Sequence, residues 1–195
     1  MSYALATFCA ASSAYTVAIS AAVESAQVAK AAMLLRRNGF VHLTGAGLFD
    51  QALIERGALT ARSDLEMMLA RLEAVGISPY DDSFSFSEAV HRSRLRYDMR
   101  IDLRRTPPDS PWEELSEKTA SLVTPIVSAA GAKQLQLAVD GLLTSLPGAD
   151  AQRFHTDGTS EHVYNALVPL VDVPDGTGTN SVPASHVDAL SLIHI

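Results

Sequence analysis

Apolar residues recur at near-helical spacing over the first part of the chain, from about Val17 to Arg37. This periodicity predicts a helix, and the Asn-Gly pair at 38–39 follows it with residue types that favour a helix end. Residues 40–43, Phe-Val-His-Leu, then predict a short strand, which the glycine-containing segment 44–47 ends.

A second helix is expected from about Ser63 to Gly76. The Ser63 hydroxyl can cap the exposed amides of the first turn, and Glu66 three residues later completes a capping box. The buried stripe of this helix would consist of Leu65, Met68, Leu69, Leu72 and Val75.

Strict alternation of polar and apolar residues predicts a strand at 96–104. The proline-rich segment 106–111 breaks the chain after it, and a helix is expected from Trp112 to about Ala130, with Pro125 as a kink point. One face of the strand carries Arg96, Asp98, Arg100 and Asp102, and the other carries Tyr97, Met99, Ile101 and Leu103.

Beyond Gly131 the pattern changes to short apolar runs separated by Pro, Gly and Asp. These runs predict strands at 134–139, 151–156, 162–173 and 181–183. Helices followed by several turn-bounded strands are typical of an α+β chain, and the late strands indicate a sandwich or a barrel.

Composition narrows the class of protein. The chain has 195 residues, of which 47% are hydrophobic, so it suits one domain with a real core. Its formal net charge of -7, without a Lys/Arg cluster, argues against nucleic acid or an anionic membrane as a partner. A single cysteine, Cys9, excludes an internal disulfide and any multi-cysteine metal site.

The two ends differ from the middle of the chain. Residues 1–23 carry no charged side chain, and the first basic residue is Lys30, so a secretory signal is not indicated. We expect 1–16 to be a leader, either loosely ordered or targeting, and 17–189 to be one domain. Residues 190–195 resemble the translation of a common sequencing adaptor and are expected to be an artefact. The sequence does not specify the cellular compartment of the protein. The default expectation is the cytoplasm, and targeting to an organelle is the alternative.

The candidate chemistry lies at His155-Thr156-Asp157. On an extended backbone, His155 and Asp157 project from the same face, so an imidazole nitrogen and a carboxylate oxygen can bind one metal ion. A second histidine from a distant strand would complete a facial triad, which leaves adjacent positions open on Fe(II).

The order of segments around this pair resembles the phytanoyl-CoA dioxygenase family of Fe(II)/2-oxoglutarate oxygenases. The resemblance rests on residues 36–43, on His155-x-Asp157, on the apolar run 163–173 and on Pro-Ala-Ser-His at 183–186, where the family has Pro-Gly-Ser-His. It implies a helical N-terminal part packed on a double-stranded β-helix (jelly-roll) core. It also implies Fe(II) and 2-oxoglutarate as cofactors, with dioxygen and a small organic or acyl substrate as partners.

The same resemblance implies that this domain is incomplete at its C-terminus. In the family, the third iron ligand and the basic residue that anchors 2-oxoglutarate follow the Pro-Gly-Ser-His stretch. His186 occupies that stretch and is only a fallback third ligand. We therefore expect the parent protein to be the enzyme and this chain to be an inactive fragment.

Other polar residues are candidates for the same pocket. Asn165 is the candidate for binding the cosubstrate, because an amide inside an apolar strand needs a hydrogen-bond partner. Arg96 and Arg100 could meet an anion, but Asp98 and Asp102 beside them favour a solvated ladder. His91 is expected at the surface.

Two other function classes stay open on the sequence. One is a non-catalytic jelly-roll binding module that has lost the triad. The other is a cupin-like metal enzyme that uses His155 and Asp157 without 2-oxoglutarate. A distal histidine followed by an arginine after residue 189 would indicate the oxygenase and not the binding module. Succinate formation from 2-oxoglutarate would indicate the oxygenase and not the cupin-like enzyme.

Overall fold

The computed structural model describes residues 4–5, 16–19, 24–45, 47–133, 135–136, 140–150 and 164–173. These residues form a mixed α+β structure, which confirms the predicted class. The elements, in chain order, are β1 (Ala4–Leu5), β2 (Thr16–Ala18), α1 (Ser25–Asn38), β3 (His42–Thr44), α2 (Gln51–Ala74), β4 (Ala89–Ser93), β5 (Arg96–Ile101), α3 (Pro111–Ala129) and β6 (Asp140–Ser145).

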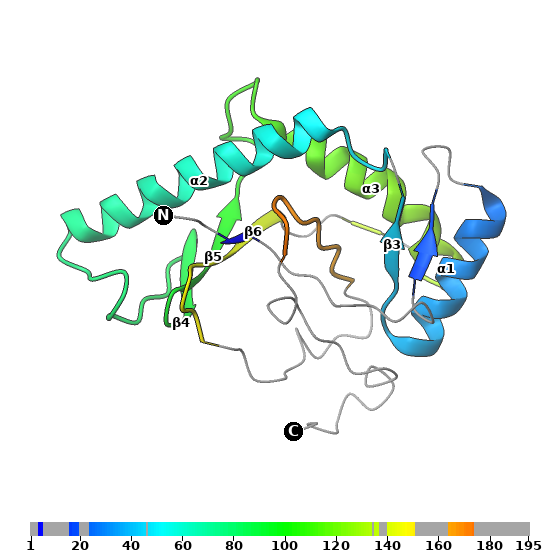
Figure 1. The fold of residues 1–195 in the computed structure, drawn as a ribbon, viewed down its shortest axis with the longest axis horizontal. Helices are drawn as coiled ribbons and strands as arrows, with labels where there is room; N and C mark the ends of the chain where they lie inside the picture. The colour runs from blue at the N-terminus through cyan, green and yellow to red at the C-terminus, as the bar shows by residue number, and fades with distance from the viewer. Residues whose placement is uncertain are drawn as a thin grey trace.

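The main sheet is antiparallel, with strand order β1-β6-β5-β4. Helices α2 and α3 lie over one face of it, and the pair β2–β3, which is parallel, lies with α1 at the other end of the molecule (Figure 1). The jelly-roll core stays a prediction, since the described strands make up only this sheet and the β2–β3 pair.

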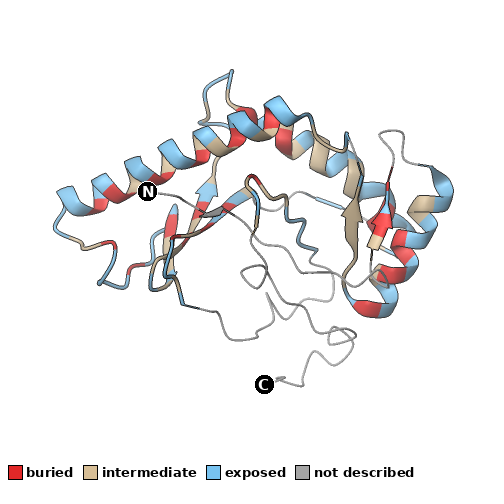
Figure 2. Ribbon diagram, viewed as in Figure 1, coloured by how far each residue is buried: buried red, intermediate tan, exposed pale blue. Residues whose placement is uncertain are grey.

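The larger core lies between the main sheet and the two long helices (Figure 2). Tyr97 on β5 is completely buried there, and its hydroxyl donates to the carbonyl oxygen of Pro79 over 2.7 Å. Thr144 on β6 pairs with Tyr97 in the ladder and is buried beside it. Strand β5 ends at Ile101, three residues before the predicted end at 104, and its apolar half faces the helices, as the alternation requires.

Polar contacts tie α2 to α3 above this core. The indole Nε1 of Trp112 donates to Asp64 over 3.1 Å, and Arg56 pairs with Glu114 at 2.8 Å. A smaller second core joins α1, β2 and β3 to the far end of α3 through Ile126. Because α3 contributes to both cores, it connects the two ends of the described structure.

Helix α2 begins twelve residues before the predicted start, and that prediction was wrong. Asp50 is the N-cap, with its carboxylate accepting from the amide of Ala52 at 2.9 Å, and Ser63 lies inside the helix. Leu53, Gly57 and Ala61 extend the buried stripe toward the N-terminus at a spacing of four residues. Four-residue spacing keeps them on one face, so burial outweighs the local capping signal.

The predicted stripe of α2 is largely confirmed. Leu65, Leu69 and Leu72 are buried, whereas Val75 is 71% exposed because it caps the helix outside its regular turns. The predicted end at Gly76 is also confirmed, since this glycine takes the left-handed φ of 79°.

Helix α1 is shorter than the periodicity predicts. It starts at Ser25 behind a capping box of Glu24 and Gln27, and Gly39 ends it in the left-handed conformation. Residues 16–18, which the periodicity assigned in part to this helix, instead pair with β3 as strand β2. The buried Val17 and Ile19 alternate with exposed Ala18, which suits a strand as well as a helix over so few residues.

Two strands of the main sheet were missed or misplaced in the sequence-based prediction. β4 was not predicted, and the strand expected at 134–139 is found at 140–145 as β6, while residues 135–136 have no regular structure. Residues 164–173 do not form a strand either, so that part of the prediction was wrong. An apolar run becomes a strand only where a neighbouring strand pairs with it, and no described strand pairs with this run.

Candidate functional site

The predicted metal ligands His155 and Asp157 and the fallback ligand His186 lie outside the described residues. Asn165 is described, but it is exposed and not part of a strand. Asn165 is therefore not the buried strand amide that the sequence predicts. Its neighbour Tyr164 is also exposed, at 39%.

The chain shortly after the His-x-Asp pair is anchored on the two long helices. Leu170 is only 7% exposed and belongs to the main core. A Cβ built on Gly57 of α2 would lie 3.2 Å from Cδ2 of Leu170 and 2.9 Å from Cδ1 of Leu115 on α3. Gly57 therefore makes room for both leucines, a contact that no local sequence pattern predicts.

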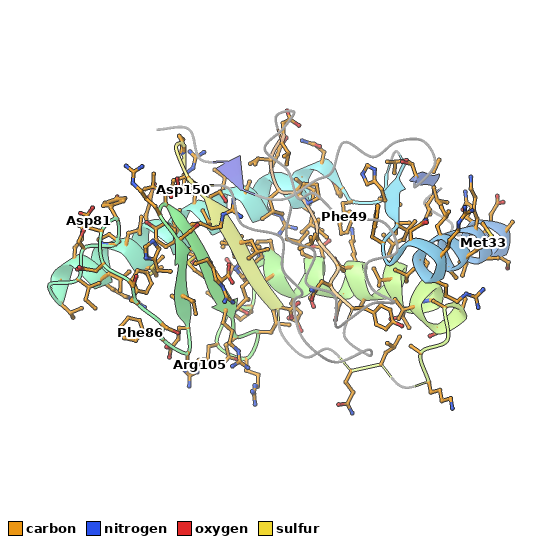
Figure 3. All side chains as sticks on the ribbon, turned by 90° about the horizontal axis from the view of Figure 1, so that it is seen from below. Met33, Phe49, Asp81, Phe86, Arg105 and Asp150 are labelled. Atoms are coloured by element: carbon orange, nitrogen blue, oxygen red, sulfur yellow. The ribbon has the colours of Figure 1, made fainter. Side chains whose placement is uncertain are left out.

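The face of the main sheet that turns away from α2 and α3 carries the charged half of β5. Figure 3 views the molecule from this side, with Phe86 beside the sheet and Arg105 just after β5. A bulge in β4 shifts the register between His91 and Ser93, so that Arg92 and Ser93 together oppose Arg96. Several polar side chains thus gather on one face, which we call the sheet's polar face: Arg92, Ser93, Arg96, Asp98, Arg100 and Ser145.

Ion pairing on the polar face differs from the predicted ladder, and that prediction was wrong. Asp98 Oδ2 accepts from the Nε of Arg92, which the bulge of β4 brings over it. Asp102 pairs instead with Arg104 at 3.6 Å and with Arg105 at 3.4 Å. Neither carboxylate is paired with Arg96.

The half-buried side chain of Arg96 has no hydrogen bond or ion pair among the described residues, and its Nε is buried. The hydroxyl of Ser93, its ladder partner on β4, is also buried and without a described partner. Ser145 opposes Arg96 from β6. Arg100, by contrast, lies near the carboxylate of Glu88. The pKa of Glu88 is lowered mainly by hydrogen bonds from the Ser87 side chain and the backbone, and the positive charges of Arg105 and Arg100 lower it further.

The histidines of the described residues occupy structural positions. His91 was expected at the surface, but its ring stacks between Phe84 at 5.5 Å and Tyr97 at 5.6 Å, on the helix side of the sheet. His42 is half-buried on β3, and burial lowers its pKa. Across the part of the chain that is described, no three His, Cys, Asp or Glu side chains gather to hold a metal ion.

None of the described helices is long and apolar enough to cross a membrane. No protein-family model matches the chain, and searches of curated proteins and of solved structures found no match.

Proposed function

We propose that the chain is part of an Fe(II)- and 2-oxoglutarate-dependent dioxygenase that hydroxylates a small organic or acyl substrate. The observation that carries the proposal is the pair His155-x-Asp157, followed by an apolar run that ends on the helices through Leu170. The two residues would supply two of three iron ligands. The antiparallel sheet under α2 and α3 would be part of the jelly-roll core.

The donor set suits this metal. A neutral imidazole and a carboxylate are ligands that Fe(II) accepts, and with a second histidine they would form a facial arrangement that leaves three positions open. When bound, Fe(II) and 2-oxoglutarate would supply the electrons that activate dioxygen, which is the oxidant for hydroxylation. The protein's own residues would orient the substrate beside the metal and exclude water.

The described residues contribute to this by holding the chain on both sides of the pair. β6 ends at Ser145 within the sheet, five residues before Asp150, and Leu170 is fixed between α2 and α3. The pair therefore lies in a segment of limited length between two fixed points. Fixed ends reduce the conformational freedom that a two-ligand segment must lose when it binds metal.

A turnover assay tests this proposal. The resemblance places the third ligand and the 2-oxoglutarate anchor after Ala189, so the assay needs a protein that contains both. We expect Fe(II)-dependent formation of succinate from 2-oxoglutarate. His155→Ala and Asp157→Ala should each abolish it, with the far-UV circular dichroism unchanged.

His162→Ala is the matched control, since it removes a nearby histidine without a proposed ligand role, and it should retain activity. Succinate formation that persists in His155→Ala or Asp157→Ala contradicts the proposal. A metal-dependent reaction without succinate formation would instead identify the cupin-like alternative.

A further inference from the structure

Exposed arginines gather along β5 and the turns at its two ends. Six of the chain's 15 Lys and Arg residues lie between positions 92 and 105, with only two acidic residues among them. Apolar and acidic residues separate these arginines in the sequence, so no basic run stands out there. The pairing of β4 with β5 brings them together. Five of the six are exposed, and we call this set the arginine strip: Arg92, Arg94, Arg100, Arg104 and Arg105.

Acidic side chains neutralise only part of the arginine strip. Asp102 is shared by two guanidiniums, that of Arg104 at 3.6 Å and that of Arg105 at 3.4 Å. Asp98 accepts from one further arginine of the strip, and Glu88 lies near two of its members. These are the three acids between positions 88 and 105, a segment that holds six arginines. The strip therefore keeps an excess of positive charge.

The arginine strip is accessible to a partner. The side chains of Arg104 and Arg105 are 91% and 83% exposed, and that of Arg92 is 51% exposed. Arg105 lies just after β5 in the view of Figure 3. Ion pairs between exposed side chains contribute little to stability, so the carboxylates of a partner can displace Asp102 from its two arginines. Each guanidinium presents paired N–H groups that match the two oxygens of a carboxylate.

We propose that the arginine strip binds an acidic peptide, an extended segment of another protein that carries several Asp or Glu side chains. The charges are complementary, and clusters of arginines are a recurrent means of binding acidic segments. The six residues of β5 span about 20 Å at about 3.3 Å per residue, a length that an extended peptide of about six to eight residues matches. This inference goes beyond the proposed oxygenase and does not depend on it, because no metal or cosubstrate takes part.

The charge on the rest of the chain favours a short acidic partner over a long polyanion. Positions outside 92–105 hold 20 of the chain's 22 acidic residues but only nine of its 15 Lys and Arg. A nucleic acid or an anionic bilayer would extend beyond the strip and meet this negative surface, which repels it. A short peptide lies against the strip alone, and charges farther away than about 8 Å are largely screened at physiological salt.

Fluorescence anisotropy with a dye-labelled octapeptide of alternating Glu and Ser tests this site on the full chain without metal. We expect saturable binding at about 0.05 M salt, and binding should weaken as salt is added, because the interaction is between exposed charges. The triple variant Arg94→Gln, Arg104→Gln and Arg105→Gln should bind at least about tenfold more weakly, because it loses three donors of charge-assisted hydrogen bonds.

The matched control is the triple variant Lys30→Gln, Arg37→Gln and Arg71→Gln, which makes the same change in net charge at exposed positions of α1 and α2. It should bind the peptide nearly as the wild type does, and both variants should keep the far-UV circular dichroism of the wild type. Absence of saturable binding to the wild type, or equal affinity of the two triple variants, overturns the proposal. Tighter binding of a single-stranded octanucleotide than of the peptide would assign the strip to nucleic acid and would also overturn it.

Discussion

At the scale of single residues, Tyr97 shows how burial couples this fold to pH. Its side chain is fully buried between the sheet and α2, and its hydroxyl has one carbonyl acceptor, that of Pro79. Burial raises the pKa of Tyr97 to about 12 from the ordinary 10.0, and the nearby Tyr80 adds to this in a smaller way. The neutral phenol is thus favoured in the folded protein.

The free energy of unfolding should therefore fall at alkaline pH. Below the unfolded pKa of 10 the contribution of Tyr97 is fully present, and it is lost as the pH rises toward 12, because the unfolded tyrosine ionises first. The loss from this group amounts to roughly 2–3 kcal/mol at most. Urea unfolding at about pH 9 and about pH 11 measures it.

Tyr97→Phe should show a smaller fall between these two pH values, although it also loses the hydrogen bond to Pro79. Tyr164→Phe is the matched control, since Tyr164 is 39% exposed, and its fall should equal that of the wild type. An identical fall in Tyr97→Phe and wild type would refute this explanation.

Single-residue patterns predicted which way side chains point, but not their partners. The alternation in 96–104 correctly placed Tyr97 and Met99 in the core. It wrongly gave Asp98 to the arginines of its own strand, because the bulge that brings Arg92 to Asp98 arises from a strand that was not predicted. Long-range pairing of this kind is not encoded in the local period.

At the scale of elements, the packing of α2, α3 and the 164–173 segment depends on one small residue. Glycine inside a helix costs about 1 kcal/mol relative to alanine, so its presence at position 57 needs a compensating gain. The close approach of Leu115 and Leu170 to the missing Cβ supplies that gain. This contact fixes the segment that follows the proposed metal ligands.

Leu170→Ala should consequently lower the free energy of unfolding by about 2–5 kcal/mol and make the 164–173 segment a site of rapid proteolysis. Urea unfolding and limited proteolysis followed by mass spectrometry measure the two effects. Leu167→Ala, in the same segment but 44% exposed, should change stability by less than about 0.5 kcal/mol. Equal effects of the two variants would show that Leu170 does not anchor the segment.

Helices were predicted better than strands because a helix satisfies its backbone within its own segment. The end of α1 at Gly39, the end of α2 near Gly76 and the extent of α3 after Ser110 all follow from local signals. The strands β4 and β6 needed β5 between them, and neither has a strong period of its own. The capping box at Ser63 failed because Asp50 caps a longer helix with a continuous buried face.

At the scale of the whole molecule, α3 connects two cores. Trp112 and Leu115 at its start belong to the core of the main sheet, and Ile126 near its end belongs to the core of α1, β2 and β3. Helices α2 and α3 cover only one face of the main sheet, and the polar face is turned away from them (Figure 1). The proposed iron site depends on whether His155 and Asp157 bind the same metal ion.

Anaerobic titration of the chain with Fe(II) tests that dependence most directly. One equivalent should bind weakly to the wild type, because two ligands of a triad are present, and His155→Ala or Asp157→Ala should weaken binding at least about tenfold. The controls His162→Ala and Asp150→Asn should bind as the wild type does. Wild-type affinity in both His155→Ala and Asp157→Ala would contradict the account, as would a wild-type chain that binds no iron.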